Sequence, residues 1–169
     1  MNDKKIILDL CGGTGSWSRP YLSTDYDVRV VTLPEIDVRY YTPPENVYGI
    51  LAAPPCTMFS RARTRAILKR DLRAGMSTVE ACIRIIWQCR YQKRLAFWAL
   101  ENPMGILRQF LGRPAMSFQP WEYGDAYTKQ TDIWGWFNIP TKHIVKISDP
   151  ILRKLRKGSR HGKELPSVP

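Results

Sequence analysis

Three short apolar runs constrain the fold of this chain most, because each of them ends in turn-forming or polar residues. The runs cover residues 5–10, 47–52 and 94–100, and the segments after them are Cys11-Gly12-Gly13-Thr14-Gly15, Pro54-Pro55-Cys56 and Glu101-Asn102-Pro103. Apolar runs of this length, bounded by turn signals, predict buried strands. Since the carboxyl ends of parallel strands meet at one edge of a sheet, we expect the three segments to lie together there.

The rest of the chain predicts further strands and one amphipathic helix. We expect strands over residues 28–33 and 37–41 and around 134–137, and a helical turn or more within 16–22. Ser77 and Glu80 resemble a capping box at the start of a helix that runs to about Arg90. The buried stripe expected on this helix is Val79, Cys82, Ile83, Ile86 and Trp87, with Cys82 and Cys89 as core or boundary residues.

The order of these elements predicts the fold class. Strands that alternate with helices or loops indicate an α/β three-layer fold with a mostly parallel sheet. We expect one domain over residues 1–150, followed by a basic C-terminal tail over 151–169.

The charge of the chain predicts a polyanionic partner. Its 169 residues include 26 Lys and Arg but 15 Asp and Glu, a net charge of +11. Nucleic acid is the commonest partner of so basic a protein. The basic residues cluster in two blocks, Arg61, Arg63, Arg65, Lys69, Arg70 and Arg73, and Arg153, Lys154, Arg156, Lys157, Arg160 and Lys163. A solvated basic face or tail is the alternative interpretation of each block.

Cysteine and histidine usage argues against a metal site. The chain has four cysteines and two histidines, and no two cysteines form a CxxC pair. No apolar run is long enough to span a membrane, and the first residues do not resemble a signal peptide. We therefore expect a cytoplasmic protein without disulfides, metal or a membrane partner.

Cys56 and Glu101 are the candidate catalytic residues. Two prolines fix the backbone before Cys56, and the arginines that follow would favour its nucleophilic thiolate. A carboxylate at the end of a buried strand, such as Glu101, is costly unless it is paired or functional. A packed cysteine and an N-cap or salt-bridge glutamate are the alternatives. The glycine-rich turn 11–15 would let a ligand approach its backbone, although plain turns have the same composition.

Taken together, these segments resemble the cytosine-C5 methyltransferase family. Residues 9–15 resemble its first motif, which binds S-adenosylmethionine. Pro54-Pro55-Cys56, with Phe59-Ser60 behind it, resembles the family's catalytic Pro-Cys motif, and Glu101-Asn102 is similar to its Glu-Asn pair. Tyr123-Gly124 with Lys129 and Thr131 is similar to a remnant of its later Gln-x-Arg-x-Arg motif. The resemblance covers residues 5–137.

The resemblance implies a three-layer Rossmann-like S-adenosylmethionine-dependent methyltransferase fold and a DNA (cytosine-5-)-methyltransferase activity. Cys56 would add to C6 of a cytosine, Glu101 would engage N3, and C5 would take the methyl group of S-adenosylmethionine. The implied cofactor-binding residues are Asp9, Leu10, Cys11, Gly12, Gly13, Thr14, Gly15, Trp17, Thr32, Leu33, Asp37 and Pro54. The implied substrate-binding residues are Pro55, Ser60, Arg61, Arg63, Asn102, Lys129 and Thr131.

The chain departs from the family pattern at three places. Cys11 replaces the phenylalanine that packs on the cofactor, and Trp17 is the candidate substitute. Residues 32–34 lack the acid that binds the ribose, so Glu35 is the candidate there and Asp37 the candidate for the adenine edge. Residues 129–131 lack the arginines of the later motif.

The substrate stays open on the sequence alone. The family's DNA enzymes carry a separate target-recognition domain, which the roughly 30 residues after Phe137 cannot supply. Specificity should then be low, come from a partner protein or not be needed. A duplex substrate would need base flipping, with the basic residues 61–73 as a mobile loop that closes over the flipped nucleotide. The alternatives are the same chemistry on RNA or a pyrimidine mononucleotide, and a catalytically silent nucleic-acid-binding module.

Overall fold

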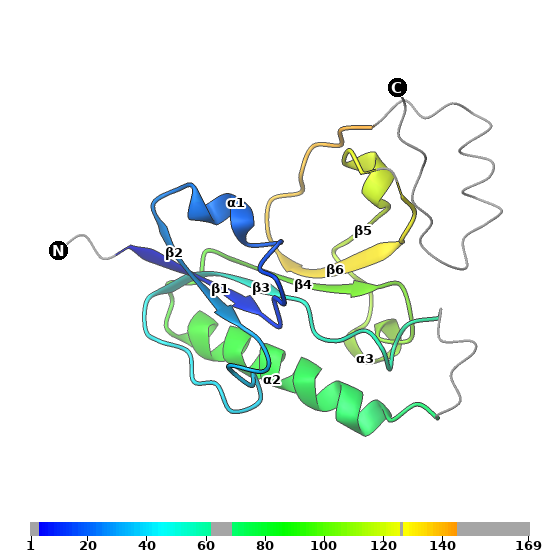
Figure 1. Cartoon of the computed structure of the whole chain (residues 1–169), viewed down its shortest axis with the longest axis horizontal. Coiled ribbons are helices and arrows are strands. Elements are labelled where there is room, and N and C mark those ends of the chain that lie inside the picture. The colour runs from blue at the N-terminus through cyan, green and yellow to red at the C-terminus, as the bar shows by residue number, and fades with distance from the viewer. Residues whose placement is uncertain (1–3, 62–68, 126, 145–169) are drawn as a thin grey trace.

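The computed structural model describes residues 4–61, 69–125 and 127–144, which contain one six-stranded sheet (Figure 1). The strands are β1 (Lys5–Leu10), β2 (Tyr26–Val31), β3 (Val47–Ala52), β4 (Phe97–Pro103), β5 (Met116–Phe118) and β6 (Thr131–Trp136). They lie in the order β2-β1-β3-β4-β6-β5. The pairings among β2, β1, β3 and β4 are parallel, whereas β6 runs antiparallel to both β4 and β5.

One long helix packs on the sheet. Helix α2 (Leu72–Tyr91) has 20 residues and lies across one face of the sheet (Figure 1). Helices α1 (Arg19–Leu22) and α3 (Arg108–Leu111) have four residues each, and residues Pro120–Glu122 form a 3-10 turn. The core lies between the sheet and α2, and its fully buried side chains include Leu8, Leu10, Ile50, Leu100, Val79 and Ile85.

The expected three-layer Rossmann-like fold with a mostly parallel sheet is wrong. The sheet is mixed, because the β5–β6 hairpin adds two antiparallel pairings beside β4. A third layer would need helices over the face opposite α2, and the described residues place only the four-residue α1 there (Figure 1). Aromatic rings pack against one another beside α1 instead, and they belong to Tyr21, Tyr26, Tyr48 and Phe97. These aromatic side chains therefore cover part of the sheet face that a layer of helices was expected to cover.

Helix α2 begins earlier than the sequence predicted. Asp71 is its N-cap, and the Asp71 carboxylate accepts a hydrogen bond of 2.9 Å from the Ala74 amide. Ser77 lies inside the helix, where its hydroxyl donates to the Ala74 carbonyl at 2.7 Å. The Ser77–Glu80 capping box was therefore a wrong prediction.

The buried stripe of α2 was predicted in part. Val79, Cys82 and Ile86 are buried, and Cys89 joins them, so the two cysteines are core residues as expected. Trp87 was expected in the stripe, yet 52% of its surface is exposed. The buried face instead includes Ala81 and Ile85.

Several strand boundaries also differ from the predictions. Residues 37–41 form a turn rather than a strand, with the Asp37 carbonyl accepting from the Tyr40 amide at 3.1 Å. Strand β4 continues through Glu101 and Asn102, because β6 pairs alongside it. The three-residue strand β5 carried no signal of its own in the sequence.

Two further expectations concern membrane-spanning segments and the C-terminal tail. The described part of the chain contains no helix with the length and apolar character that crossing a membrane requires. The expected boundary at residue 150 and the basic tail over 151–169 lie outside the described residues.

Candidate active site

The three candidate segments emerge side by side at one edge of the sheet. Leu10 at the end of β1 is in register with Ala52 of β3, and Ala52 is in register with Leu100 of β4. The Ala53 amide donates a 2.9 Å hydrogen bond to the Leu10 carbonyl, which continues this pairing beyond the strands. The glycine-rich turn, the Pro-Pro-Cys segment and the Glu-Asn pair therefore share the carboxyl edge, as the sequence predicted.

Cys56 begins a tight turn that is fastened to the core. The Cys56 carbonyl accepts hydrogen bonds of 2.9 Å from the amides of both Phe59 and Ser60. The Phe59 side chain is completely buried, while Cys56 itself is half-buried and Pro55 is exposed. The turn thus holds the thiol at the surface of the site and anchors its far end in the core.

Two further elements hold the same turn from outside. The Arg70 guanidinium donates to the Met58 carbonyl at 2.8 Å and to the Ser60 carbonyl at 2.9 Å. The Ile106 amide donates to the Phe59 carbonyl at 3.0 Å, and a side chain at Gly105 would lie 2.2 Å from that oxygen. Sequence analysis placed Arg70 in a mobile phosphate-binding loop, whereas its guanidinium is committed to this turn.

Asn102 joins the Glu-Asn pair to the Pro-Pro-Cys segment. Its buried side-chain amide donates a 2.9 Å hydrogen bond to the Pro54 carbonyl, across 48 residues of sequence. Its Oδ1 atom is buried and has no hydrogen-bond partner among the residues that the structure describes. Asn102 was predicted to bind substrate, and the structure places it against the loop that carries the cysteine. Pro54, an implied cofactor residue, is likewise buried at this junction.

Glu101 is the titratable group whose surroundings match the predicted role. Successive residues of a strand face opposite sides, so Glu101 of β4 does not share the buried position of Asn102 and stays half-exposed. Burial raises the pKa of Glu101; the charge of Lys129 lowers it and that of Asp132 raises it further. The protonated carboxyl group is therefore favoured over a wider pH range than in an ordinary glutamate.

The glycine-rich turn has the backbone that a ligand-binding turn requires. Gly13 and Gly15 have φ angles of +54° and +69°, and Cys11 adopts the same left-handed region at +58°. No atom lies within 4 Å of where a Gly13 side chain would begin, so that backbone faces open space. The Gly13 amide donates to the Thr32 hydroxyl at 3.3 Å. Thr14 is also exposed, and Leu10 lies in the core.

Asp9 supports this turn from below. Its carboxylate is completely buried, and neither oxygen has a hydrogen-bond partner in the described part of the chain. A side chain at Gly12 would lie 2.4 Å from the Asp9 carboxyl carbon, so only glycine fits over it. Burial raises the pKa of Asp9, and Ser18 offsets part of that rise.

Cys11 forms a thiol pair that the sequence gave no reason to expect. Cys11 packs on the core that contains Cys82. The neighbouring Cys82 thiol lowers the pKa of Cys11, whereas burial and the charges of Asp37 and Asp9 raise it. Cys11 and burial together raise the pKa of Cys82.

The remaining implied cofactor residues differ in their exposure and in their hydrogen-bond partners. The charge of Asp37 acts on Cys11, but its carboxylate accepts hydrogen bonds from the backbone and side chain of Arg39. Arg39 thereby lowers the pKa of Asp37. Trp17 is half-buried and Leu33 is 65% exposed. Asp37 has an ion-pair partner already, so it would have to share its oxygens with an adenine.

The implied substrate residues divide into three groups. Ser60 belongs to the Cys56 turn, and Arg61 is exposed directly after it. Lys129 is exposed and its charge reaches Glu101, while Thr131 is buried with its hydroxyl on the Lys129 carbonyl at 2.8 Å. Arg63, like Arg65 and the basic block of the tail, lies outside the described residues.

An ion pair between the half-exposed Arg108 and the buried Asp132 supports the antiparallel side of the site and was missed in the sequence. Asp132 of β6 is completely buried, and the Arg108 guanidinium donates to both of its oxygens at 2.6 Å. The Ser117 hydroxyl of β5 donates to Asp132 at 2.7 Å. Asp132 stands opposite Asn102 in the β4–β6 register, so this network fixes the strand next to Glu101. Only the three-dimensional pairing reveals it, because the three residues belong to separate elements.

Two further findings concern metal ligands and the comparison of the chain with known proteins. Among residues 4–61, 69–125 and 127–144, no three His, Cys, Asp or Glu side chains gather as metal ligands would. Neither the protein-family models nor the curated proteins compared with the chain match it.

Proposed function

We propose that the chain is an S-adenosylmethionine-dependent enzyme that methylates C5 of cytosine in DNA. The observation that supports this proposal most is the hydrogen bond from Asn102 to the Pro54 carbonyl. It ties the Pro-Pro-Cys segment to the strand that carries Glu101, so a nucleophile and an acid of the type this reaction needs are held at one edge of the sheet.

Cys56 and Glu101 divide the chemistry of the pyrimidine ring. The Cys56 thiolate adds to C6 while the Glu101 carboxyl group gives its proton to N3, so C5 becomes nucleophilic. C5 then gains the methyl group. A base removes the C5 proton, the Cys56–C6 bond breaks, and N3 returns its proton to Glu101, so that the thiolate and the protonated Glu101 are regenerated and 5-methylcytosine is released. The raised pKa of Glu101 supports its part, because it must hold a proton to give.

The glycine-rich turn is the proposed cofactor site. S-adenosylmethionine supplies an electrophilic methyl group when it is bound. The open backbone at Gly13, the polar Thr14 and Thr32 side chains and the nearby Asp37 carboxylate fit a ligand with both polar and charged groups. The Asp9 carboxylate lies beneath the turn and would act by shaping it.

DNA is the proposed substrate because of the charge of the chain and the exposed Arg61 beside the Cys56 turn. A duplex would need its target base flipped out of the stack before Cys56 could reach C6. RNA, a pyrimidine mononucleotide, the need for a specificity partner protein and a cytoplasmic location stay predictions. The same holds for the silent nucleic-acid-binding alternative.

The decisive experiment offers methyl-labelled S-adenosylmethionine together with duplex DNA, single-stranded DNA, RNA or dCTP in separate reactions. We expect label in DNA, at C5 of cytosine, from the natural chain and none from Cys56→Ala. Cofactor binding, measured by calorimetry, should survive in Cys56→Ala because the cysteine does not belong to the proposed cofactor site. Labelling by Cys56→Ala at the natural rate would refute the covalent mechanism, and no cofactor binding at all would favour the silent module.

A further inference from the structure

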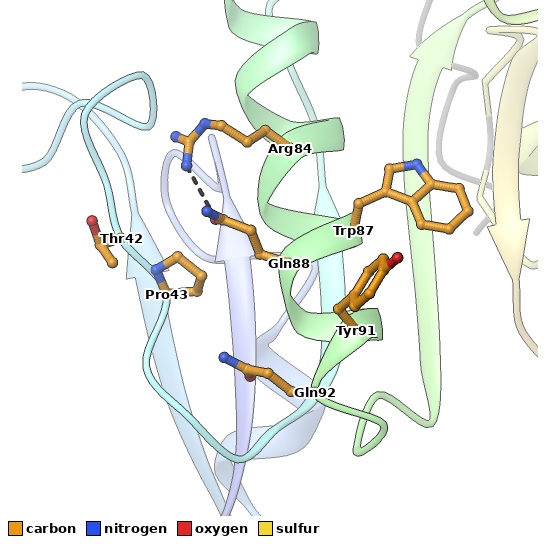
Figure 2. Close-up of a pocket in the computed structure, with 7 residues that line it drawn as sticks. All are labelled: Thr42, Pro43, Arg84, Trp87, Gln88, Tyr91 and Gln92. Carbon is orange, nitrogen blue, oxygen red and sulfur yellow. Dashed lines mark hydrogen bonds between the residues drawn. The ribbon is translucent and has the colours of Figure 1, made fainter.

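Two neighbouring hollows lie at the sheet edge opposite the candidate active site. The first is a groove of about 590 Å³ lined by Thr42, Pro43, Arg84, Trp87, Gln88, Tyr91 and Gln92. Figure 2 shows Arg84 and Gln88 on the side of α2 that faces Thr42 and Pro43, and Trp87 and Tyr91 on its other side. The second is a pocket of about 280 Å³ lined by Lys4, Lys5, Asn46, Tyr48 and Arg94. The loop from Pro43 to Asn46 and the segment after Tyr91 join them, just before β3 and β4 begin. We call the two hollows and the segments that join them the amino-edge surface.

Two aromatic side chains of the amino-edge surface are exposed to water, which is unfavourable for their apolar surface. Trp87 is 52% exposed and Tyr91 is 86% exposed, one helical turn apart on α2. Figure 2 shows both rings projecting from the same side of the helix. The Arg90 guanidinium lies 5.1 Å from the centre of the Trp87 ring, so a cation accompanies the aromatic face.

The charge of the amino-edge surface is positive. Arg84, Lys4, Lys5 and Arg94 line the two hollows, and no Asp or Glu does. Lys4 forms an exposed ion pair of little strength with Asp25, at 3.4 Å. Glu45 is also exposed in the joining loop. Two carboxylates thus stand against a larger number of cations, in a chain with a net charge of +11.

We propose that the amino-edge surface binds single-stranded DNA, with bases stacked on Trp87 and Tyr91 and phosphates held by Arg90, Arg94 and Lys5. The Arg84 guanidinium stays on the Arg39 and Tyr41 carbonyls. Exposed aromatic rings and cations together are what a single strand needs, because each unpaired base offers a face for stacking. In a duplex those faces are covered by neighbouring bases. Only the choice of DNA over RNA rests on the proposed function.

The amino-edge surface is separate from the site of chemistry. It adjoins the first residues of β3 and β4, whereas Cys56 and Glu101 follow or end these strands. A strand of six residues spans about 20 Å. The amino-edge surface would therefore hold the substrate strand at a distance from the reacting base.

Fluorescence anisotropy of a labelled 20-nucleotide oligothymidine, measured with the full chain and no cofactor, tests this proposal. We expect Trp87→Ala/Tyr91→Ala to weaken binding at least tenfold, and Trp87→Phe/Tyr91→Phe to bind as the natural chain does. Trp136→Ala is the matched control, because Trp136 is a 65% exposed tryptophan of β6 outside both hollows. We expect Arg90→Gln/Arg94→Gln to reduce the slope of log affinity against log salt by about 1.4, the loss of two phosphate contacts.

The outcomes separate this proposal from the proposed function. Unchanged affinity in Trp87→Ala/Tyr91→Ala, an equal loss in Trp136→Ala, or tighter binding of a duplex would overturn it. Tighter binding of the matching RNA would overturn the choice of DNA. Cys56→Ala should bind the oligothymidine as the natural chain does, so a failure of methyl transfer leaves this measurement intact.

Discussion

Gly75 is where helix α2 meets the turn that carries Cys56. An alanine Cβ at this position would lie 2.8 Å from Met58 Cβ and 3.0 Å from Phe59 Cζ. Non-bonded carbon atoms prefer separations of about 3.5–4.0 Å. Phe59 is completely buried, so its ring cannot move aside without disturbing the core. The absence of a side chain at Gly75 is what lets the helix approach the turn.

Two opposing effects decide the result of Gly75→Ala. Replacing glycine by alanine inside a helix stabilises it by about 1 kcal/mol. Overpacking a filled site costs about 1–3 kcal/mol. We therefore expect Gly75→Ala to lower the free energy of unfolding by about 1 kcal/mol, although helix propensity alone predicts a gain of the same size.

Urea unfolding followed by circular dichroism measures this difference, with Glu80→Ala as the control on the exposed side of α2. Glu80→Ala should change the free energy of unfolding by less than about 0.5 kcal/mol. If the proposed function holds, Gly75→Ala should also lower kcat and leave cofactor affinity unchanged, because the displaced residues belong to the Cys56 turn. A stability gain of about 1 kcal/mol would show that the helix and the turn are not in contact.

Three other predictions follow from named groups. Glu101→Gln should lower kcat by about 100-fold or more; in the natural enzyme, kcat should fall as pH rises through the raised pKa of Glu101, and a pH–rate profile without that alkaline fall would contradict its role as acid. Iodoacetamide at neutral pH should label Cys11 before Cys89, because Cys82 lowers the pKa of Cys11 and burial raises the pKa of Cys89 to about 11; peptide mass spectrometry showing equal rates would count against this. Arg108→Met should cost about 3–5 kcal/mol in urea unfolding, since it leaves the buried Asp132 carboxylate without its cation, and a cost below about 1 kcal/mol would refute a structural role for the pair.

Local signals in the sequence were sufficient to locate the ends of β1 and β3, but not the end of β4, which pairs with β6 as far as Pro103. The apolar run before Pro54 is unbroken in sequence, and so is the apolar run before Glu101. Parallel pairing of the two strands aligned these runs in the structure. The start of α2 was misplaced because Asp71 and Ser77 are both good caps, and only the contact of the first turn with Met58 and Phe59 favours the earlier one.

The sheet and the supports of the site depend on contacts between distant residues. The strand prediction at 37–41 failed because β-branched and aromatic residues form strands only where a neighbouring strand is present to pair with them. The role of Arg70 could not be read from its basic neighbours, since its two acceptors are backbone carbonyls that every residue possesses. The β5–β6 hairpin likewise gains its stability from Asp132 and Arg108, which are 24 residues apart.

The Glu-Asn pair gains a physical explanation from the alternation of a strand. Asn102 points to the buried side, where its amide holds the Pro54 carbonyl, and Glu101 is left half-exposed at the same edge. One residue can therefore position the loop of Cys56 while its neighbour keeps a proton available, and neither role interferes with the other. One residue inserted between them would place both side chains on the same side of the strand, so the pair must stay adjacent for Asn102 to be buried while Glu101 is half-exposed. In the proposed function, the Asn102 side chain would thus act on the reaction through the loop that it holds.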